Sequence, residues 1–448
     1  MLTREEAKRV LDAALAASDA DETEAFLGGG MFALTRFANN IIHQNVAEEG
    51  TTLSVRVVIG KRTARVTTTR TDPDGIKAAV HRAKAAAKMS REYPDLLPLP
   101  EPADSKNVDA YDEATARLSP MDRAGKVAEA IRPSEKAGLW TAGYFSNNTG
   151  NMGSWGESGI FAIANSKGLF EYYRATEAGF SLTSFAGDSS GWVLASSRQA
   201  SKIPVGELGE RAAEKAQRSQ DPKAIEPGRY TVILEPAAVG DLCYFLAEGF
   251  NAQQVDEGRS FLSGKVGETV FGQNIDIDDD PYHPLIQGRP FDGEGVPTKV
   301  VSLVEKGVVK GLVYDRKTAA KLGKEPTGHG LPVPNVEGAH PSSISMKGGT
   351  SSIEEMIKST KKGILVTRLW YNRLVDPMKL IITGMTRDGT FWVEDGKISH
   401  GIKNLRYNQS LIELLNHVDA ATPQERMWGY AVPGILAREF NFTSVTLF

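Results

Sequence analysis

Apolar residues recur at helical spacing at the start of the chain and then give way to strand-like alternation. Thr3 and Glu6 form a capping-box pattern, and the apolar positions that follow predict a helix over residues 3–18. Further on, the β-branched run 51–59 and the run 62–69 flank a Gly-Lys turn, which predicts an antiparallel hairpin. The first part of the chain is therefore expected to combine a helix with antiparallel strands.

Three further helices are predicted between longer strand-rich segments. One begins at Pro73, and the others cover 121–137 and 205–218. Residues 140–185 alternate between apolar and polar types and contain Asn- and Gly-rich turns, which indicates long hairpins. Residues 93–113 are rich in Pro, Asp and Glu and show no period, so they are expected to connect two domains.

The last part of the chain combines one conspicuous helix with many short strands. A strand at 230–234 leads into the helix 237–250, and a closing helix is expected at 408–417. The high density of Gly-containing turns indicates antiparallel sheets that fold on themselves as a sandwich or open barrel. The strands predicted there cover 298–304, 308–313, 363–370, 379–385 and 390–393.

These patterns define the expected fold class and domain organisation. A chain of 448 residues exceeds what one hydrophobic core usually organises, so several domains are expected. We predict an α+β protein with an N-terminal helix and antiparallel-sheet domain at 1–105 and a central domain of long hairpins and helices at 106–227. A β-rich C-terminal domain, a sandwich or open barrel with one conspicuous helix, is expected at 228–448.

Composition narrows the class of protein. Hydrophobic residues make up 41% and charged residues 24% of the chain, as in folded soluble proteins. The net charge of -4 gives no long-range field for nucleic acid or an anionic membrane, and no apolar run approaches the roughly 20 residues of a membrane helix. The single cysteine, Cys243, excludes a disulfide framework, and the charged N-terminal segment is unlike a signal peptide. We expect a cytoplasmic protein that binds neither nucleic acid nor membrane.

A search for catalytic motifs finds no complete one. No two of the 7 histidines have the spacing of paired metal ligands on a helix, so HExxH and HExxxH are absent. The acidic run 276–280 fails the calcium-loop pattern and is expected to be a solvated loop. The phosphate-loop-like segment 258–265 has the wrong spacing, and Ser359 with Lys362 lacks the partner motifs of serine-lysine enzymes. His329, flanked by two glycines, is the histidine best suited to meet a substrate.

The helix predicted at 237–250 is more informative than these motifs. Its apolar stripe faces the core, so Cys243 is expected to be a buried small hydrophobe and not a reactive thiol. The stripe consists of Val239, Leu242, Cys243, Leu246 and Phe250, whereas Tyr244, Glu248 and Asn251 lie off it.

Several C-terminal motifs, in their order and spacing, resemble the TldD/PmbA family, once described as modulators of DNA gyrase and now understood as a peptidase system. The resemblance covers nearly the whole chain, with weaker agreement around 49–62. The matching pieces are VILEP at 232–236, SFLSGKVGE at 260–268, PFDGEGVPT at 290–298, PTGH at 326–329 and GMTRDGTFWVEDGKI at 384–398.

The resemblance also implies that a zinc site is missing. Catalytic TldD-type members carry HExxxH on the helix after this strand, which supplies two zinc ligands and the general base, and a third ligand near the C-terminus. The matching positions here are Tyr244, Phe245 and Gly249, and the segment 441–448 has no cysteine. These positions cannot form a tetrahedral zinc site that activates water. The chain therefore resembles the PmbA (TldE) type, with no metal or catalytic residue of its own and zinc expected in a TldD-type partner.

The resemblance implies a role and a set of substrate-binding residues. In the family, a TldD subunit and a TldE subunit form a dimer that encloses a cavity and cleaves unfolded peptides or leader peptides. This chain is expected to shape that chamber and to hold substrate. The residues expected to bind substrate are Arg259, Ser260, Asp292, Glu294 and His329.

The sequence leaves two other functions open. A stand-alone homodimer would bind extended peptides by adding a strand to an exposed sheet edge, without proteolysis. A different enzyme would have rebuilt a site from four of the residues just named, His329, Asp292, Glu294 and Arg259.

Overall fold

The N-terminal half of the chain is built on one antiparallel sheet. The computed structural model describes residues 2–149 and 159–446. The sheet has 8 strands in the order β3-β2-β1-β4-β7-β8, and β5 pairs with both β1 and β6. Its strands are β1 (Glu22–Ala38), β2 (Ile41–Ile59), β3 (Arg62–Thr68), β4 (Trp140–Asn148), β5 (Gly159–Asn165), β6 (Phe170–Ala175), β7 (Glu177–Ala186) and β8 (Ser189–Ser197).

The predicted hairpin is confirmed, but the strands around it are longer than expected. β2 pairs with β3 from Leu53 to Ile59, and it extends back to Ile41 along β1. The strands β1 and β2 approach closely at their glycines, because a Cβ on Gly29 would lie 2.6 Å from the carbonyl oxygen of Gly50. Only a residue without a side chain fits there, so the glycines allow a close contact within continuous strands.

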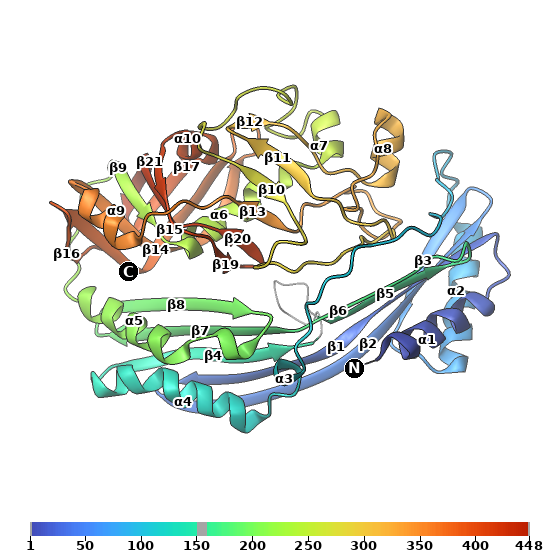
Figure 1. Cartoon of the computed structure of the whole chain (residues 1–448), viewed down its shortest axis with the longest axis horizontal. Coiled ribbons are helices and arrows are strands. Elements are labelled where there is room, and N and C mark those ends of the chain that lie inside the picture. The colour runs from blue at the N-terminus through green and yellow to red at the C-terminus, as the bar shows by residue number, and fades with distance from the viewer. Residues whose placement is uncertain (1, 150–158, 447–448) are drawn as a thin grey trace.

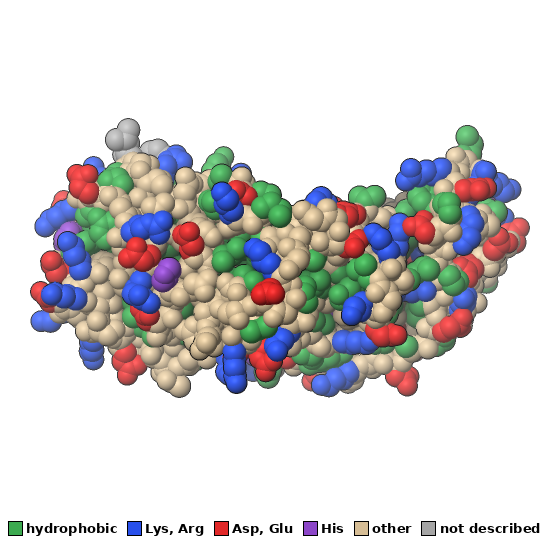
Figure 2. Space-filling model, turned by 90° about the horizontal axis from the view of Figure 1, so that it is seen from above, with side chains coloured by type: hydrophobic (Ala, Val, Ile, Leu, Met, Phe, Trp, Pro, Cys, Tyr) green, Lys and Arg blue, Asp and Glu red, His purple; other side chains and the backbone are tan. Residues whose placement is uncertain are grey.

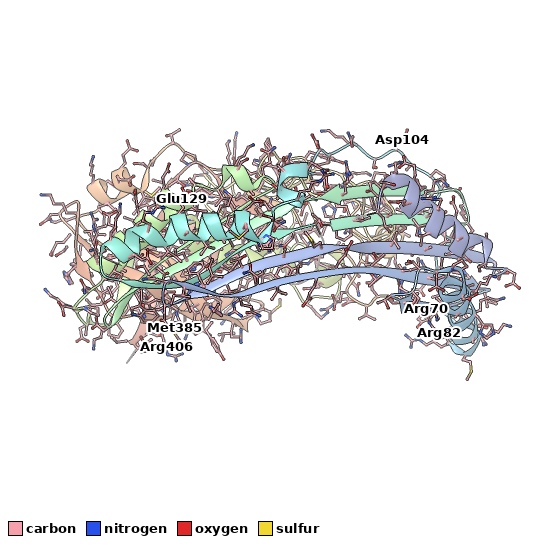
Figure 3. All side chains as sticks on the ribbon, turned by 90° about the horizontal axis from the view of Figure 1, so that it is seen from below. Arg70, Arg82, Asp104, Glu129, Met385 and Arg406 are labelled. Atoms are coloured by element: carbon pink, nitrogen blue, oxygen red, sulfur yellow. The ribbon has the colours of Figure 1, made fainter. Side chains whose placement is uncertain are left out.

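Helices cover one face of the sheet in two groups. The capping box of Thr3 and Glu6 is present at the start of α1, as predicted. Both α2 and α4 begin with a proline, and for α2 the sequence predicts this start. In Figures 1 and 3, α1 and α2 lie at one end of the sheet, and α4 and α5 lie at the other. The helices are α1 (Arg4–Ala16), α2 (Pro73–Met89), the short α3 (Glu113–Ala116), α4 (Pro120–Lys136) and α5 (Val205–Arg218), with a 3₁₀ turn at Ala200–Lys202.

The C-terminal half contains a six-stranded sheet and a strand ring with the helix α6 against them. The first has the order β12-β11-β10-β13-β20-β19. The second runs β14-β9-β21-β17-β15, and β15 also pairs with β14, which closes a barrel of the kind expected. The remaining strands β16 and β18 attach to this ring. Helix α6 (Pro236–Glu248) packs its apolar side in the largest core cluster, together with residues of both sheets.

The strands and helices of this half have the following bounds. The first sheet contains β10 (Ile277–Asp279), β11 (Val301–Glu305), β12 (Val308–Val309), β13 (Ile344–Met346), β19 (Glu425–Met427) and β20 (Tyr430–Val432). The ring and its attached strands are β9 (Gly228–Leu234), β14 (Lys362–Asp376), β15 (Ile381–Glu394), β16 (Lys397–Gly401), β17 (Leu405–Ser410), β18 (Val418–Ala421) and β21 (Ile435–Val445). The shorter helices are α7 (Ala252–Asp256), α8 (Arg316–Leu322), α9 (Ile353–Ser359) and α10 (Leu411–Asn416).

Three expectations for this half were wrong. The strands expected at 379–385 and 390–393 form one strand, β15, that passes through Asp388 and Gly389 with positive φ angles of 55° and 119°. A helix is present in the range 408–417 as the short α10, but it does not close the chain as expected, because the strands β18 to β21 follow it. The acidic run expected to be a solvated loop forms β10, because it pairs with β11 and β13.

The two halves are joined by buried ion pairs and by a shared cluster of apolar side chains. Glu177, at the start of β7, lies 2.8 Å from Nη2 of Arg426 and 3.5 Å from Nη1 of Arg198. Both arginines also donate to the carbonyl oxygen of Ile286. Nearby, Phe291 from the C-terminal half packs in a cluster with N-terminal residues of β5 and β6. The C-terminal half therefore lies directly on the sheet face that the helices leave free (Figure 1).

Some expectations fall partly outside the described residues. The sheet uses strands from both sides of the boundary predicted near residue 105, and the domain boundaries stay a prediction. Two parts of these predictions lie outside the described residues. They are residues 150–158, within the hairpin region predicted at 140–185, and residues 447–448, within the C-terminal segment compared with the family. None of the helices in the described residues is long and apolar enough to cross a membrane.

Candidate functional site

Helix α6 is positioned by the strand before it and by its apolar side. Strand β9 leads into Pro236, whose fixed φ suits the first turn of a helix. The apolar stripe predicted from the sequence is confirmed, because Val239, Leu242, Cys243 and Leu246 are all buried. Burial raises the pKa of the Cys243 thiol to about 12, as expected for a small hydrophobe in the core.

The other side of α6 carries Tyr244, Phe245 and Gly249, the three positions at which the resemblance implies a metal site in TldD-type members. Tyr244 is 46% exposed, and its ring stands edge-on to that of Phe245 with centroids 5.3 Å apart. One turn further on, Oε1 of Glu248 lies 3.1 Å from Nδ1 of His340. The hydrogen bond from His340 lowers the pKa of Glu248 below its usual value. This side of the helix therefore presents the ring of Tyr244 and a carboxylate paired with an imidazole, while Phe245 packs against the core.

The third of these positions, Gly249, is closed against any larger side chain. A Cβ placed on Gly249 would lie 2.0 Å from Cε1 of Phe261, a ring that is itself packed edge-on to Phe250 and Phe271. Ser260 reinforces the contact, since its hydroxyl donates to the carbonyl oxygen of Gly249 over 2.7 Å. A histidine at position 249 would have no space, so these positions do not fit the zinc site that the resemblance implies for TldD-type members. Within residues 2–149 and 159–446, no group of three His, Cys, Asp or Glu side chains is placed to hold a metal ion.

Near the middle of α6, a partly exposed acidic residue contacts the barrel. The Oδ2 atom of Asp241 accepts a hydrogen bond of 3.3 Å from the backbone N–H of Leu369 on β14. Burial raises the pKa of Asp241 to about 7, although the positive charge of Arg368 opposes this shift. The contact ties the exposed side of α6 to the outer part of β14.

Asp292 and Glu294 form a buried acid pair in the loop after β10. Asp292 accepts backbone hydrogen bonds from Glu294, Val296 and Gly330 at 2.7 to 2.9 Å, and Glu294 accepts one from Arg316 at 2.9 Å. A Cβ on Gly330 would lie 2.4 Å from a Glu294 oxygen and 3.0 Å from an Asp292 oxygen, so both carboxyl groups crowd one point. Burial, and then the charge of Asp292, raises the pKa of Glu294 to about 8. Burial also raises the pKa of Asp292.

His329 lies close to this pair in a second buried interaction. Its Nε2 is 3.0 Å from Oδ1 of Asp279, and both side chains have no solvent exposure. Burial lowers the pKa of His329, and the charge and hydrogen bond of Asp279 more than offset this effect, so the pKa is raised above its usual value. Asp279 also accepts a hydrogen bond of 3.0 Å from the N–H of Ser343.

The structure divides the five residues expected to bind substrate. It brings Asp292, Glu294 and His329 together, but in the interior, where their polar atoms bond to the protein. Ser260 is 3% exposed beneath Gly249. Arg259 is on the surface, paired with Glu257, and is not part of the buried group.

Sequence reasoning missed two residues of this region. Asp279 was hidden inside an acidic run, and only its partner His329 in a distant loop shows why it is buried. No local pattern in the sequence places His340 beside Glu248. Both pairs depend on contacts between segments far apart in the chain, and no local pattern announces them.

The surface gives no sign of a nucleic-acid site on the face drawn in Figure 2. Basic and acidic side chains are interspersed there, with apolar side chains between them. A nucleic-acid interface gathers Lys and Arg on one face instead.

Comparison with known proteins places these features in a family. Models of the PmbA/TldA metallopeptidase match the chain in three parts, as domain 1 over residues 32–87, as the central domain over 110–220 and as the C-terminal domain over 227–444.

Three similar proteins illustrate the match. A "Metalloprotease" of Methanothermobacter thermautotrophicus is 30% identical over 228 residues, 50% of this chain and 49% of that protein, so the chain matches about half of its length. A "Metalloprotease PmbA homolog" of Haemophilus influenzae is 24% identical over 82% of this chain and 79% of its own length. The crystal structure of TldE from Thermococcus kodakarensis has a TM-score of 0.85 at 22% identity, covering 98% of this chain and 100% of that one, which shows the fold.

Proposed function

Because this chain belongs to the PmbA/TldD metallopeptidase family, we propose that it is the metal-free, PmbA/TldE-type subunit of a two-subunit zinc peptidase. In this proposal a TldD-type partner supplies the zinc and the catalytic groups. The complex degrades or processes unfolded peptides and leader peptides in the cytoplasm. This chain contributes a wall of the chamber in which they are held.

The observation that carries the proposal is the contact between Gly249 and Phe261. Tyr244 and Phe245 are aromatic at the positions of the first zinc ligand and the general base, and a Cβ at Gly249, the position of the second ligand, would lie 2.0 Å from the ring of Phe261. The apolar side of α6 is nevertheless fully packed, so the helix keeps its structural role. A helix that keeps its packing while positions 244 and 245 are aromatic and position 249 admits no side chain supports a subunit whose task is structural and binding, and not hydrolytic.

The residues on the exposed side of α6 suit the binding part of this role. Tyr244 offers an aromatic face to a peptide side chain, and Glu248 offers a carboxylate that stays charged because His340 pairs with it. A carboxylate of this kind can accept hydrogen bonds from a peptide amine or a basic side chain. We propose these residues, and not the buried Asp292, Glu294 and His329, as the first contacts of a peptide.

Metal content and activity test the proposal together. Purified chain is expected to contain no stoichiometric zinc by mass spectrometry and to leave an unfolded casein substrate intact. Addition of a purified TldD-type subunit from the same genome is expected to give a complex of equal stoichiometry that cleaves the substrate and is inhibited by a chelator. Stoichiometric zinc in this chain, or chelator-sensitive cleavage by this chain alone, would contradict the proposal.

One observation favours the alternative of a stand-alone homodimer that binds peptides. The first part of β2, Ile41–Thr52, pairs with β1 on one side, and no strand of the described residues pairs with its other edge. Such an edge can receive an extended peptide as a further strand. Capture from the native cytosol separates the two functions, because the alternative requires self-association without a TldD-type chain.

A further inference from the structure

Tyr244 on α6 is an exposed aromatic side chain without a cation over its ring. The aromatic side chains of the described residues that are at least 40% exposed are Trp140, Tyr244, Trp370 and Tyr371. Trp140 is stacked on Phe185, and arginines lie over the rings of Trp370 and Tyr371. Within residues 2–149 and 159–446, no Lys or Arg lies over the ring of Tyr244, which stands edge-on to Phe245. The exposed part of this ring can therefore accept a cation from another molecule.

A charged carboxylate lies next to this ring. Glu248 follows Tyr244 by four residues on α6, and side chains with this spacing are neighbours on a helix, with Cβ atoms about 5–6 Å apart. The side chain of Glu248 is 41% exposed, and the hydrogen bond from His340 lowers its pKa, so it is ionised at neutral pH. In the part of the chain that the structure describes, no Lys or Arg forms an ion pair with Glu248. One ligand cation can therefore contact the ring and the carboxylate together.

Two donors hold the carboxylate of Glu248 in place and leave part of it open. Its Oε1 atom lies 3.1 Å from Nδ1 of His340, and the side chain of Gln254 on α7 forms a second hydrogen bond with it. The backbone of His340 is fixed in turn, because its N–H donates to the carbonyl oxygen of His329 over 2.9 Å. An ionised carboxylate has about four acceptor positions, so acceptor positions remain for a ligand. The group is oriented before a ligand arrives, which lowers the entropy lost on binding.

Further acidic residues surround the ring of Tyr244. Asp241 precedes it by three residues on the same side of α6, and Arg368 offsets part of the charge of this carboxyl group. Beyond the end of α6, Nδ2 of Asn251 donates to the backbone oxygen of Glu337 over 2.6 Å, which brings this acidic residue to the same end of the helix. Among the described residues, Glu337 takes part in no ion pair. The electrostatic surroundings therefore favour a positively charged ligand.

We propose that Tyr244 and Glu248 bind the guanidinium group of an arginine side chain, which lies over the ring and donates hydrogen bonds to the carboxylate. Arginine suits this pair better than lysine, because its planar group stacks on aromatic rings and presents a fork of donors to a carboxylate. That the arginine belongs to a peptide rests on the function proposed above, whereas the guanidinium class rests on the two side chains themselves.

Binding by this chain alone tests the proposed site. Short Gly/Ser peptides with one central arginine, lysine or citrulline differ only in that side chain, and citrulline keeps nearly the shape of arginine without its charge. We expect the dissociation constant from saturation-transfer NMR at pH 8 to be lower for the arginine peptide than for the citrulline peptide by at least about fivefold, with lysine between them. Equal affinities for the arginine and citrulline peptides would overturn the proposal.

Substitutions assign the preference to the two side chains. Glu248→Gln keeps an acceptor for His340 and removes the charge, so the arginine and citrulline peptides are expected to bind within about twofold of each other. Tyr244→Leu is expected to weaken binding of the arginine peptide by about two- to fivefold, whereas Tyr244→Phe keeps the ring and the preference. Glu325→Gln, an equal change of charge at an exposed position elsewhere, is expected to leave both dissociation constants unchanged. A preference that persists in Glu248→Gln would contradict the assignment.

The outcomes separate failure of the guanidinium site from failure of the proposed function. If this chain prefers the arginine peptide but forms no active complex with a purified TldD-type subunit, the site stands and the proposed function is wrong. If the complex is active while the chain binds arginine and citrulline peptides equally, the site is wrong and the function stands. If a leucine peptide binds more tightly than the arginine peptide, Tyr244 serves an apolar side chain and the proposal is overturned. Unchanged thermal unfolding of Glu248→Gln confirms that its lost preference is not a loss of fold.

Discussion

The ring of Phe261 fills the space into which a side chain at Gly249 would extend. The distance from a Cβ on Gly249 to Cε1 of the ring would be 2.0 Å, which is far below any real contact. The residue has an ordinary helical φ of -67°, so a glycine is required here by the neighbouring ring and not by the backbone. The packing of the core therefore excludes a histidine at position 249, in addition to the sequence of α6 lacking one.

Substitution of Gly249 tests this relationship directly. We expect Gly249→Ala to lower the free energy of unfolding by about 1–3 kcal/mol, because Phe261 must move within a packed aromatic cluster. Gly125→Ala is the matched control, since nothing lies within 4 Å of its Cβ position on α4. That variant is expected to stabilise the chain by about 0.5–1 kcal/mol. Denaturant titrations measure both, and equal stabilities of the two variants would contradict the packing argument.

Restoring HExxxH is expected to fail for the same reason. The triple variant Tyr244→His, Phe245→Glu, Gly249→His supplies both histidines and the glutamate in sequence, yet the last side chain meets Phe261. We expect the triple variant to be less stable than the unchanged chain and to bind no stoichiometric zinc in equilibrium dialysis. Tight zinc binding by a folded triple variant would show that the ring moves aside easily.

The buried acid pair predicts a pH dependence of stability. The pKa of Glu294 is raised from 4.5 to about 8 in the folded chain, so the folded state binds more protons than the unfolded state between these values. Its contribution to stability is present at low pH and is lost as the pH rises toward about 8. Glu294→Gln keeps an acceptor for the Arg316 N–H and removes the titration.

We therefore expect the unfolding free energy of Glu294→Gln to vary less between pH 5 and pH 9 than that of the unchanged chain, with a difference on the order of a few kcal/mol. Glu325→Gln, at an exposed position, serves as the control and is expected to leave the profile unchanged. Parallel profiles for the unchanged chain and Glu294→Gln would contradict the raised pKa of Glu294.

The single thiol gives a simple test of the core around α6. Burial raises the pKa of Cys243 to about 12, so at pH 8 only roughly one molecule in ten thousand carries the reactive thiolate. We expect no reaction with a thiol reagent such as dithionitrobenzoate in the folded protein and one thiol per chain after denaturation. Rapid stoichiometric labelling of the folded chain would mean that α6 opens readily.

The pair of Glu248 and His340 predicts a measurable change in one carboxyl group. The hydrogen bond from His340 is the largest cause of the lowered pKa of Glu248, so His340→Phe is expected to move that pKa upward, toward or beyond its usual value. Carbon-13 NMR titration of a side-chain-labelled sample measures the shift. His283→Phe is the comparison variant, because the ring nitrogen of that histidine bonds to Leu285 elsewhere. An equal titration of Glu248 in both variants would contradict the pairing.

The sequence predicts the elements whose signals are local. The capping box at Thr3 and Glu6 and the apolar stripe through Cys243 depend on neighbours within a few residues, and the structure confirms both. Strand β15 was divided in two because Arg387, Asp388 and Gly389 have the composition of a turn. In the fold, Asp388 adopts a positive φ and binds Arg368 and Ser190, so the strand continues through a bulge.

The candidate site was predictable only in part for the same physical reason. The absence of HExxxH at Tyr244, Phe245 and Gly249 is visible in the sequence, but the closure of position 249 depends on Phe261, which lies in another segment. Likewise, the spacing of PFDGEG could not show that Asp292 and Glu294 are both buried, because their partners are backbone groups of distant loops. Contacts between residues far apart in the sequence decide which carboxyl groups are buried, and burial raises their pKa.

Strand β1 has a consequence for how such a protein can evolve. It pairs with β2 along one edge, and along the other it pairs first with β5 and then with β4. The segments matched by the first two family models, 32–87 and 110–220, are therefore joined by the pairing of β1 with β4. A gene crossover between them would ask a foreign strand to match two pairing patterns at once. A crossover near residue 227 would separate no paired strands, because β9 pairs only with strands of the C-terminal half, so the recombined halves would have to match only at their mutual contacts, such as the buried pair of Glu177 and Arg426.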